Sequence, residues 1–350
     1  MHLNELIPSW LMAPGGHLAL RVALALLPVL IFLTVLVWLD SFRLVRKSRV
    51  LLALLAGAVG ALLSYVVNSV ILDLTGLPTV TFAIVAAPLV EETFKGLWVA
   101  WQIRQRQVGF LVDAAILGFA TGGGFAIVEN IYYLQNLSEV PLLVWAVRGL
   151  GTALMHGGTT AILAVYLRGR SDRRQGGPPW LAAVFLATLL HASFNRFMTQ
   201  PVLATLAMVV ILPILMTLVY RQGEHRLRTW LGRGFDRDRE LLSLINEGQV
   251  HTTPLGKYLV SLREHFRPDT VADMLCMLRL QAELSIRAKG VLMLREQGFE
   301  PAPDPQLAGK LDELRWLEAS IGPTGKLAMR PICHWRGADR WQRHLLEETD

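Results

Sequence analysis

Residues 50–72 have the sequence VLLALLAGAVGALLSYVVNSVIL, which contains no charged side chain. A bilayer core is about 30 Å thick, so a helix that crosses it needs about 20 apolar residues in succession. Six further runs of comparable length and composition lie at 22–39, 79–103, 110–135, 141–167, 180–199 and 202–220. We therefore expect an all-α fold, a polytopic membrane bundle of about seven transmembrane helices within residues 18–220.

Charged residues are scarce in this part of the chain and common after it. The first 220 residues contain 14 Lys or Arg and 9 Asp or Glu, about a tenth of the positions. The remaining 130 contain 20 and 19, about three tenths, whereas soluble proteins are about a quarter charged. The contrast predicts a soluble domain at 221–350, and the composition excludes a disordered, collagen-like or disulfide-rich secreted chain. Cys276 and Cys333 show no CxxC spacing, and we interpret them as reduced cytosolic thiols.

Positive charges lie in alternate connections between the apolar runs. Lys and Arg occur in 40–49, 104–109 and 168–179, and they are absent from 73–78 and 136–140. By the positive-inside rule, the amino-terminal segment 1–17 is external and 221–350 is cytosolic. Because these positive charges flank membrane runs, the net charge of +6 does not indicate a nucleic-acid partner. No basic segment precedes the first run, so we expect a span there rather than a cleavable signal peptide.

The soluble domain is predicted to be helical, with a regulatory or interaction role. Asp269 is a suitable start for a helix and Gly298 a suitable end. The apolar spacing of a second helix ends at Gly322, and the Pro-rich segment 299–305 links the two. The apolar face of this second helix contains Leu307, Leu311, Leu314, Leu317 and Ile321.

Four successive apolar runs contain polar or ionisable residues at positions within the bilayer, where they cost free energy. A charge at the centre of a bilayer costs about 2.5–3.5 kcal/mol on insertion scales, so such residues usually have a function. The candidate catalytic residues are Glu91, Glu92, Glu129, His156, His191 and Asn195, with Lys95 and Asn130 in support. Pro88 favours a kink before the glutamate pair, and the three glycines at 122–124 allow a neighbouring helix to come close.

Each of these residues also has a structural interpretation. Glu91 and Lys95 would form a buried ion pair within one helix. Each histidine would act as a hydrogen-bonded strut between helices, and Asn195 would join two helices. Asp113 and Arg148 lie nearer the membrane interfaces, where we expect pairing or snorkelling rather than chemistry. A third glutamate and two histidines in neighbouring spans favour a functional site over this alternative.

The ordered set of motifs resembles the PrsW family of intramembrane proteases. The third run contains EETFK at 91–95, which resembles the EExxK motif of that family, and the fourth contains FAIVEN at 125–130, which resembles its FxxxEN element. The sixth contains HASFN at 191–195, which resembles the HxxxN element of the wider superfamily of CAAX-processing and bacteriocin-processing membrane proteases. The resemblance covers about 80–200 and implies cleavage of a single-span membrane protein, such as an anti-sigma factor. CAAX-type members have EExxxR and a histidine in the fourth span, so the resemblance does not extend to prenyl-protein processing.

Peptide hydrolysis needs a base for water, a donor for the oxyanion and a proton for the leaving amine. A buried glutamate suits the first and last tasks, imidazoles orient the water, and Asn195 donates to the oxyanion. His156, His191 and Glu129 also fit a three-ligand zinc site with an open position. Because there is no HExxH motif, the spacing alone does not indicate a metal.

The two adjacent glutamates are expected to have different roles. They are about 100° apart on a helix, so they cannot face one water molecule from the same side. Lys95 lies four residues after Glu91 and is expected to pair with it. Glu92 has no such partner in this prediction and is therefore favoured as the general base.

The sequence supports an intramembrane endopeptidase of the bacterial inner membrane, a hydrolase with a cytosolic helical domain that binds a protein partner. A proton-coupled transporter or channel is the alternative, because buried Glu and His also relay protons. Against it, no pair of interrupted helices indicates inverted repeats. A membrane-anchored sensor or scaffold, in which the bundle only anchors 221–350, is the third interpretation.

Overall fold

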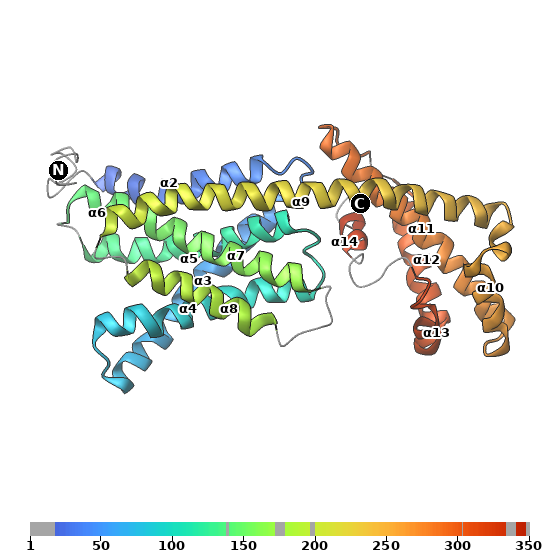
Figure 1. Ribbon diagram of the computed structural model, residues 1–350, viewed down its shortest axis with the longest axis horizontal. Coiled ribbons are helices and arrows are strands. Elements are labelled where there is room, and N and C mark those ends of the chain that lie inside the picture. The colour runs from blue at the N-terminus through green and yellow to red at the C-terminus, as the bar shows by residue number, and fades with distance from the viewer. Residues whose placement is uncertain are drawn as a thin grey trace. The chain divides into compact units, whose positions relative to one another are not determined.

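The computed structural model describes residues 18–137, 140–171, 179–196, 200–302, 304–333 and 341–347. Every regular element within these ranges is a helix, which confirms the all-α prediction (Figure 1). The expected external segment 1–17 and most of the Arg-containing connection 168–179 lie outside the described residues. The chain forms two compact units, one of Met1–Asp40 with Leu44–Gly223 and one of Ser41–Arg43 with Glu224–Asp350.

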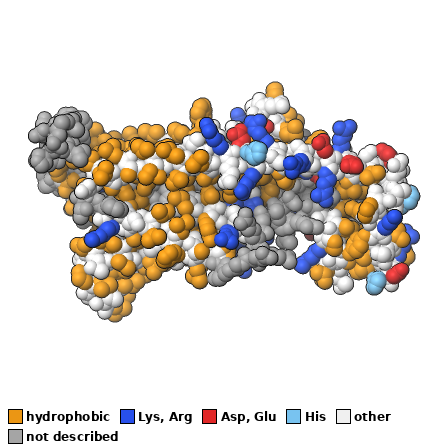
Figure 2. Space-filling model, in the orientation of Figure 1, with side chains coloured by type: hydrophobic (Ala, Val, Ile, Leu, Met, Phe, Trp, Pro, Cys, Tyr) orange, Lys and Arg blue, Asp and Glu red, His pale blue; other side chains and the backbone are white. Residues whose placement is uncertain are grey.

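The first unit is a bundle of long apolar helices. Five of its helical segments are long and apolar enough to cross a membrane, namely α2, α3, α5, the continuous segment Leu142–Arg170 and α9. Many of its large hydrophobic side chains are exposed, as expected for contact with lipid, and Figure 2 shows them covering this unit. Its helices are α2 (Leu18–Trp38), α3 (Lys47–Thr75), α4 (Thr79–Arg104), α5 (Leu111–Asn136), α6 (Leu142–Val147), α7 (Ala153–Arg170), α8 (Pro179–Arg196) and α9 (Pro201–Asn246).

The two remaining predicted spans, α4 and α8, are also helical within their described residues, but they are not among those five segments. These two helices contain the glutamate pair, Lys95, His191 and Asn195, which reduce their apolar character. Each packs within the bundle, with α4 against α3 and α8, and α8 against α7. The polar residues of the candidate site therefore explain why these two helices differ from the rest.

Helix α5 lies at the centre of the bundle. Nearly all residues in its first half are buried, and it packs against α3, α7 and α2 (Figure 1). Two of its glycines are required by these contacts. A Cβ at Gly122 would lie 2.1 Å from the backbone oxygen of His156, and one at Gly124 would lie 1.9 Å from that of Leu54. The predicted close approach of neighbouring helices to residues 122–124 is thus confirmed.

The predicted fifth span contains one turn of π-helix. Helix α6 continues through η2 (Arg148–Thr152) into α7 without a break. Such wide turns occur mostly within α-helices and frequently at functional sites. Here the turn contains Arg148, and Gly149 beside it allows α2 to approach, since a Cβ there would lie 1.8 Å from the oxygen of Leu24.

The second unit is a smaller helical assembly that begins within α9. Helix α11 covers the first helix predicted in this domain, from Asp269 to Gly298, and Gly298 after it has a φ of 84°. All five apolar residues predicted to share a face in and after α12 are buried, and Gly322 follows with a φ of 65°. Its further elements are η4 (Gln249–Thr252), α10 (Pro254–Ser261), η5 (Leu262–Glu264), α11 (Pro268–Glu296), α12 (Leu307–Ser320), α13 (Gly322–Met329) and α14 (Trp341–Glu347).

Candidate active site

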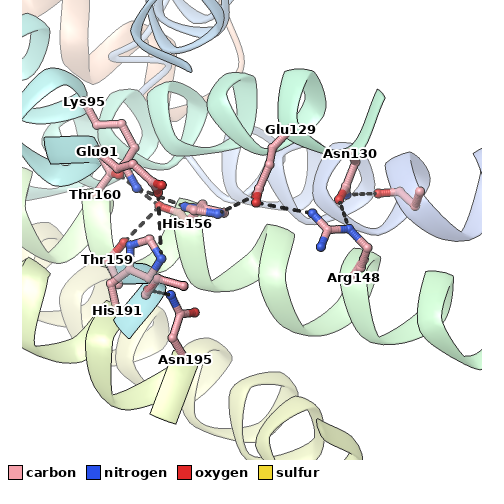
Figure 3. Close-up of polar contacts among 12 residues, drawn as sticks. Glu91, Lys95, Glu129, Asn130, Arg148, His156, Thr159, Thr160, His191 and Asn195 are labelled. Atoms are coloured by element: carbon pink, nitrogen blue, oxygen red, sulfur yellow. Dashed lines mark hydrogen bonds and ion pairs between the residues drawn. The ribbon is translucent and has the colours of Figure 1, made fainter. Parts of the chain in front are cut away.

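Polar side chains from α4, α5, α7 and α8 meet inside the first unit. Glu91, Lys95, Glu129, His156 and His191 point toward one another from these four helices (Figure 3). Glu92 lies at the centre of the group and is fully buried. The structure therefore brings together the residues that the sequence predicts to converge.

One oxygen of Glu92 accepts three hydrogen bonds. Oε1 lies 2.5 Å from Lys95 Nζ, 2.9 Å from His191 Nδ1 and 3.1 Å from Thr159 Oγ1. The other oxygen, Oε2, is buried and has no hydrogen-bond partner among the described residues. Glu92 is thus fixed through one oxygen and retains a second acceptor inside the site.

This geometry corrects the expected pairing of Lys95. The prediction that Lys95 pairs with Glu91 and leaves Glu92 without a cation is wrong, because Lys95 pairs with Glu92, three residues before it. Residues at i+3 and i+4 both share a helix face with residue i, so the spacing admits either partner. Packing decides between them: Glu92 and Lys95 point into the bundle and are both fully buried, whereas the Glu91 side chain is 16% exposed.

The partners of the two histidines identify their neutral tautomers. A lysine ammonium only donates, so Nδ1 of His156, which lies 3.0 Å from Lys95 Nζ, accepts a hydrogen bond. Nε2 of His156 then donates to Glu129 Oε2 at 2.9 Å. For His191, Nδ1 donates to the Glu92 carboxylate at 2.9 Å, so in the neutral ring Nε2, which lies 3.9 Å from Glu91 Oε2, carries the lone pair.

A second series of polar contacts, through Arg148 and Asn130, reaches the other oxygen of Glu129. Arg148 Nη2 lies 3.4 Å from Glu129 Oε1, and Arg148 Nε donates to Asn130 Oδ1 at 2.9 Å. Asn130 in turn donates to the backbone oxygen of Ala25 at 2.8 Å. Arg148 is a pairing residue, as expected, and its partner is one of the candidate catalytic residues.

Asn195 lies one turn after His191 on α8. Its Nδ2 donates to the backbone oxygen of Ala83 on α4 at 2.9 Å, so it joins the two helices, as the structural interpretation expects. A side-chain amide carries two N–H groups, and this bond uses one of them. The predicted contribution to an oxyanion would use the other.

Glu91, His156 and His191 form the group best placed to hold a metal ion. One donor atom from each lies within 4.8 Å of the others. Two donors that share a tetrahedral zinc ion at about 2.0–2.2 Å are about 3.3–3.6 Å apart, so this group, in which His191 Nε2 and Glu91 Oε2 are 3.9 Å apart, would have to contract around the ion. The sequence predicts Glu129 as the carboxylate in this set, but Glu129 instead contacts His156 and Arg148.

The charges and polar atoms of the site also fit a cation. The three carboxylates outnumber the two cations Lys95 and Arg148, which leaves one surplus negative charge when all five are ionised. A buried surplus charge is costly unless a cation or proton balances it. The unpaired Oε2 of Glu92 is an additional acceptor within the same group.

Two members of the network are not predicted as site residues from the sequence. Thr159 donates to Glu92, and Arg148, which the sequence assigns to an interface, reaches Glu129. Thr159 lies three residues after His156, which is the only sequence signal that it faces the same site.

Comparison with known proteins identifies a family for the segment that contains this group of residues. A family model described as PrsW family intramembrane metalloprotease matches residues 46–219, a segment that contains every residue of the network except Ala25. No curated protein and no solved structure matches the chain.

Proposed function

This chain belongs to the PrsW family of intramembrane metalloproteases, and from that premise we propose that it hydrolyses a peptide bond at Glu91, His156 and His191. The observation that carries the proposal is the meeting of one carboxylate and two imidazoles from three helices inside an apolar bundle. Such a group can hold water, orient it and accept its proton.

We propose that Glu91 is the general base, which accepts the proton of the attacking water molecule. Its Oε2 lies 3.9 Å from Nε2 of His191, and no Lys or Arg lies within ion-pair distance of it among the described residues. Glu92 is a poorer acceptor because its Oε1 is occupied by Lys95, His191 and Thr159. Glu91 replaces Glu92 as the favoured general base for this reason.

Glu92 and Glu129 are positioning residues in this mechanism. Each carboxylate accepts from one imidazole and fixes which ring nitrogen faces the reaction, His191 through Glu92 and His156 through Glu129. Carboxylates behind histidines also orient these rings in metal sites. The second N–H of Asn195 is the proposed donor to the oxyanion that forms on the scissile carbonyl.

Glu91, His156 and His191 are also the residues that would hold the metal of this metalloprotease family, with zinc as the proposed ion. A bound zinc ion polarises a carbonyl and lowers the pKa of its water. His191 is suited to this role because, with Nδ1 bonded to Glu92, Nε2 of the neutral ring carries the lone pair. His156 would exchange one of its two present partners for the ion.

The proposed substrate is a single-span membrane protein, such as an anti-sigma factor, in the bacterial inner membrane. A site inside a bundle of lipid-facing helices is suited to a peptide bond that lies within the bilayer. The second unit is proposed to be cytosolic and to bind a protein partner.

Cleavage of a fluorescent single-span reporter by the full-length protein in liposomes tests the proposal. Glu91→Gln is expected to abolish cleavage, and His191→Ala to reduce it at least a hundredfold, while both variants retain wild-type assembly. Asp73→Asn is the matched control, because Asp73 is an exposed carboxylate at the end of α3.

Metal content measured on the same samples separates the two roles of Glu91. A Glu91→Gln protein that keeps its metal but not its activity identifies Glu91 as the base, and loss of both identifies it as a ligand. Normal cleavage by Glu91→Gln and by His191→Ala contradicts the proposed site, and proton flux in the same liposomes then tests the transporter alternative.

A further inference from the structure

A cavity of about 600 Å³ lies within the second unit, between α9, α11 and α14. Its volume is in the range of small-molecule sites, which is about 300–1,000 Å³. The cavity is remote from the proteolytic residues in sequence, and nothing in the proposed reaction uses it.

Three arginines of α9 line this cavity from one face of the helix. Arg226, Arg233 and Arg237 are spaced by seven and four residues, which places them within about 20° of a common direction at about 100° per residue. Each is exposed, and none forms an ion pair among the described residues. Like charges four residues apart destabilise a helix by several tenths of a kcal/mol, so the arrangement does not serve the fold.

The inner wall of the cavity is polar and buried. Lys289 on α11 is 3% exposed and lies 2.5 Å from Asp238. Gly234 makes room for it, because a Cβ there would lie 2.6 Å from Lys289 Nζ. Gln342 on α14 lines the same cavity, and its buried Oε1 has no hydrogen-bond partner among the described residues. Amide oxygen and nitrogen exchange by a simple flip, so Gln342 is suited to either a donor or an acceptor on a ligand.

We infer that this cavity binds a phosphate-bearing anion. Guanidinium groups bind phosphate through paired hydrogen bonds, and Arg226, Arg233 and Arg237 supply three of them around one opening. The buried polar wall adds directional contacts that a merely solvated basic face lacks. Arg226 follows Tyr220, the end of the last apolar run, by six residues, so the phosphate comes either from a phospholipid headgroup or from a soluble phosphate compound.

The same helix provides a connection to the proteolytic unit. In its membrane-spanning part, Leu212 of α9 contacts Gly158, two residues after His156, since a Cβ at Gly158 would lie 2.9 Å from Leu212 Cδ1. An anion that fixes the basic part of α9 would thus act on an element that also packs beside the site. Binding itself is measured independently of proteolysis.

Two probes applied to the full-length protein test the inference and separate the two sources. Inorganic pyrophosphate is titrated by calorimetry into detergent-solubilised protein. In parallel, native mass spectrometry measures the lipid retained from nanodiscs of phosphatidylglycerol and phosphatidylcholine. Saturable binding of one pyrophosphate supports a soluble ligand, and selective retention of phosphatidylglycerol supports a headgroup.

The variants locate the binding in the cavity. Arg226→Gln, Arg233→Gln and Arg237→Gln combined should weaken binding at least tenfold. The matched control is Arg239→Gln, Arg263→Gln and Arg279→Gln, which removes the same charge from exposed positions of this unit outside the cavity lining. Thr229→Trp, which fills the cavity without changing charge, should also weaken binding. The inference is overturned if neither probe binds, if the two triple variants lose binding equally, or if binding survives Thr229→Trp unchanged.

Discussion

At the scale of single residues, Glu92 and Lys95 depend on each other. Both side chains are fully buried, and removing one partner of a buried ion pair costs about 3–5 kcal/mol because the other charge is left uncompensated. Glu92→Gln should therefore lower the unfolding midpoint in detergent strongly, and Glu91→Gln only slightly. The double variant Glu92→Gln with Lys95→Met should recover much of the lost stability without recovering cleavage. A Glu92→Gln protein as stable as the wild type would contradict the ion pair.

Arg148 offers a second prediction at this scale. It supports Glu129, which in turn holds the Nε2–H of His156. Arg148→Met should reduce reporter cleavage about tenfold or more, and Arg148→Lys should reduce it less, because the charge remains while the bond from Nε to Asn130 is lost. Equal activities of the two variants would show that the charge of Arg148 is unimportant to the site.

The site residues themselves can be predicted from the sequence, but their contacts cannot. The polar positions Glu91, Glu92, Glu129, His156 and His191 are predictable because charge and imidazole are rare in apolar runs. Their pairing is not, because it depends on how far each helix is rotated and which rotamer fits. Thr159 is missed for the same reason, since nothing in a threonine within an apolar run shows whether its hydroxyl meets a carboxylate or its own backbone.

At the scale of helices, the contact between α5 and α7 determines where His156 lies. Gly122→Ala would place a methyl group 2.1 Å from the backbone oxygen of His156 and force the helices apart. We expect this variant to lose at least nine tenths of its cleavage activity and to unfold at a lower temperature. Gly123→Ala is the matched control, because its Cβ would first meet a Val29 methyl group at 3.1 Å. Similar losses in the two variants would show that helix propensity, and not the contact, is responsible.

Helix boundaries follow the apolar runs closely, and the exceptions have physical causes. Each of the seven predicted runs forms a helix within its described residues, including α4 and α8, although these two contain half of the polar site. The π-turn at Arg148–Thr152 is not predictable from periodicity, because the apolar pattern continues through it. It arises where α2 and α9 both approach small residues, Gly149 and Gly151.

At the scale of the molecule, the residues of the proposed proteolytic site all belong to the first unit. Truncation after Gly223 removes most of the second unit and leaves every residue of the site in place. The shortened protein should therefore insert and retain part of its cleavage of the model reporter in liposomes. Complete loss of activity in a truncated protein that still inserts would show that the second unit takes part in the reaction itself.

Orientation in the membrane is the last property that the chain should determine as a whole. Arg43 and Arg46 precede α3, and Lys47 and Arg49 lie in its first turn, whereas residues 73–78 at its other end include no Lys or Arg. The positive-inside rule then places residues 73–78 outside and the second unit, which continues directly from α9, in the cytosol.

Cys276 is exposed, so in a Cys333→Ser background a membrane-impermeant maleimide should label it only after spheroplasts are lysed. In a protein with Cys276→Ser, Cys333→Ser and Thr75→Cys, the reagent should label intact spheroplasts, because Thr75 is exposed at the end of α3. Labelling of Cys276 from outside would reverse the orientation. Labelling of both sites from one side would mean that an even number of spans separates them, and one of α4 to α9 would then not cross the bilayer.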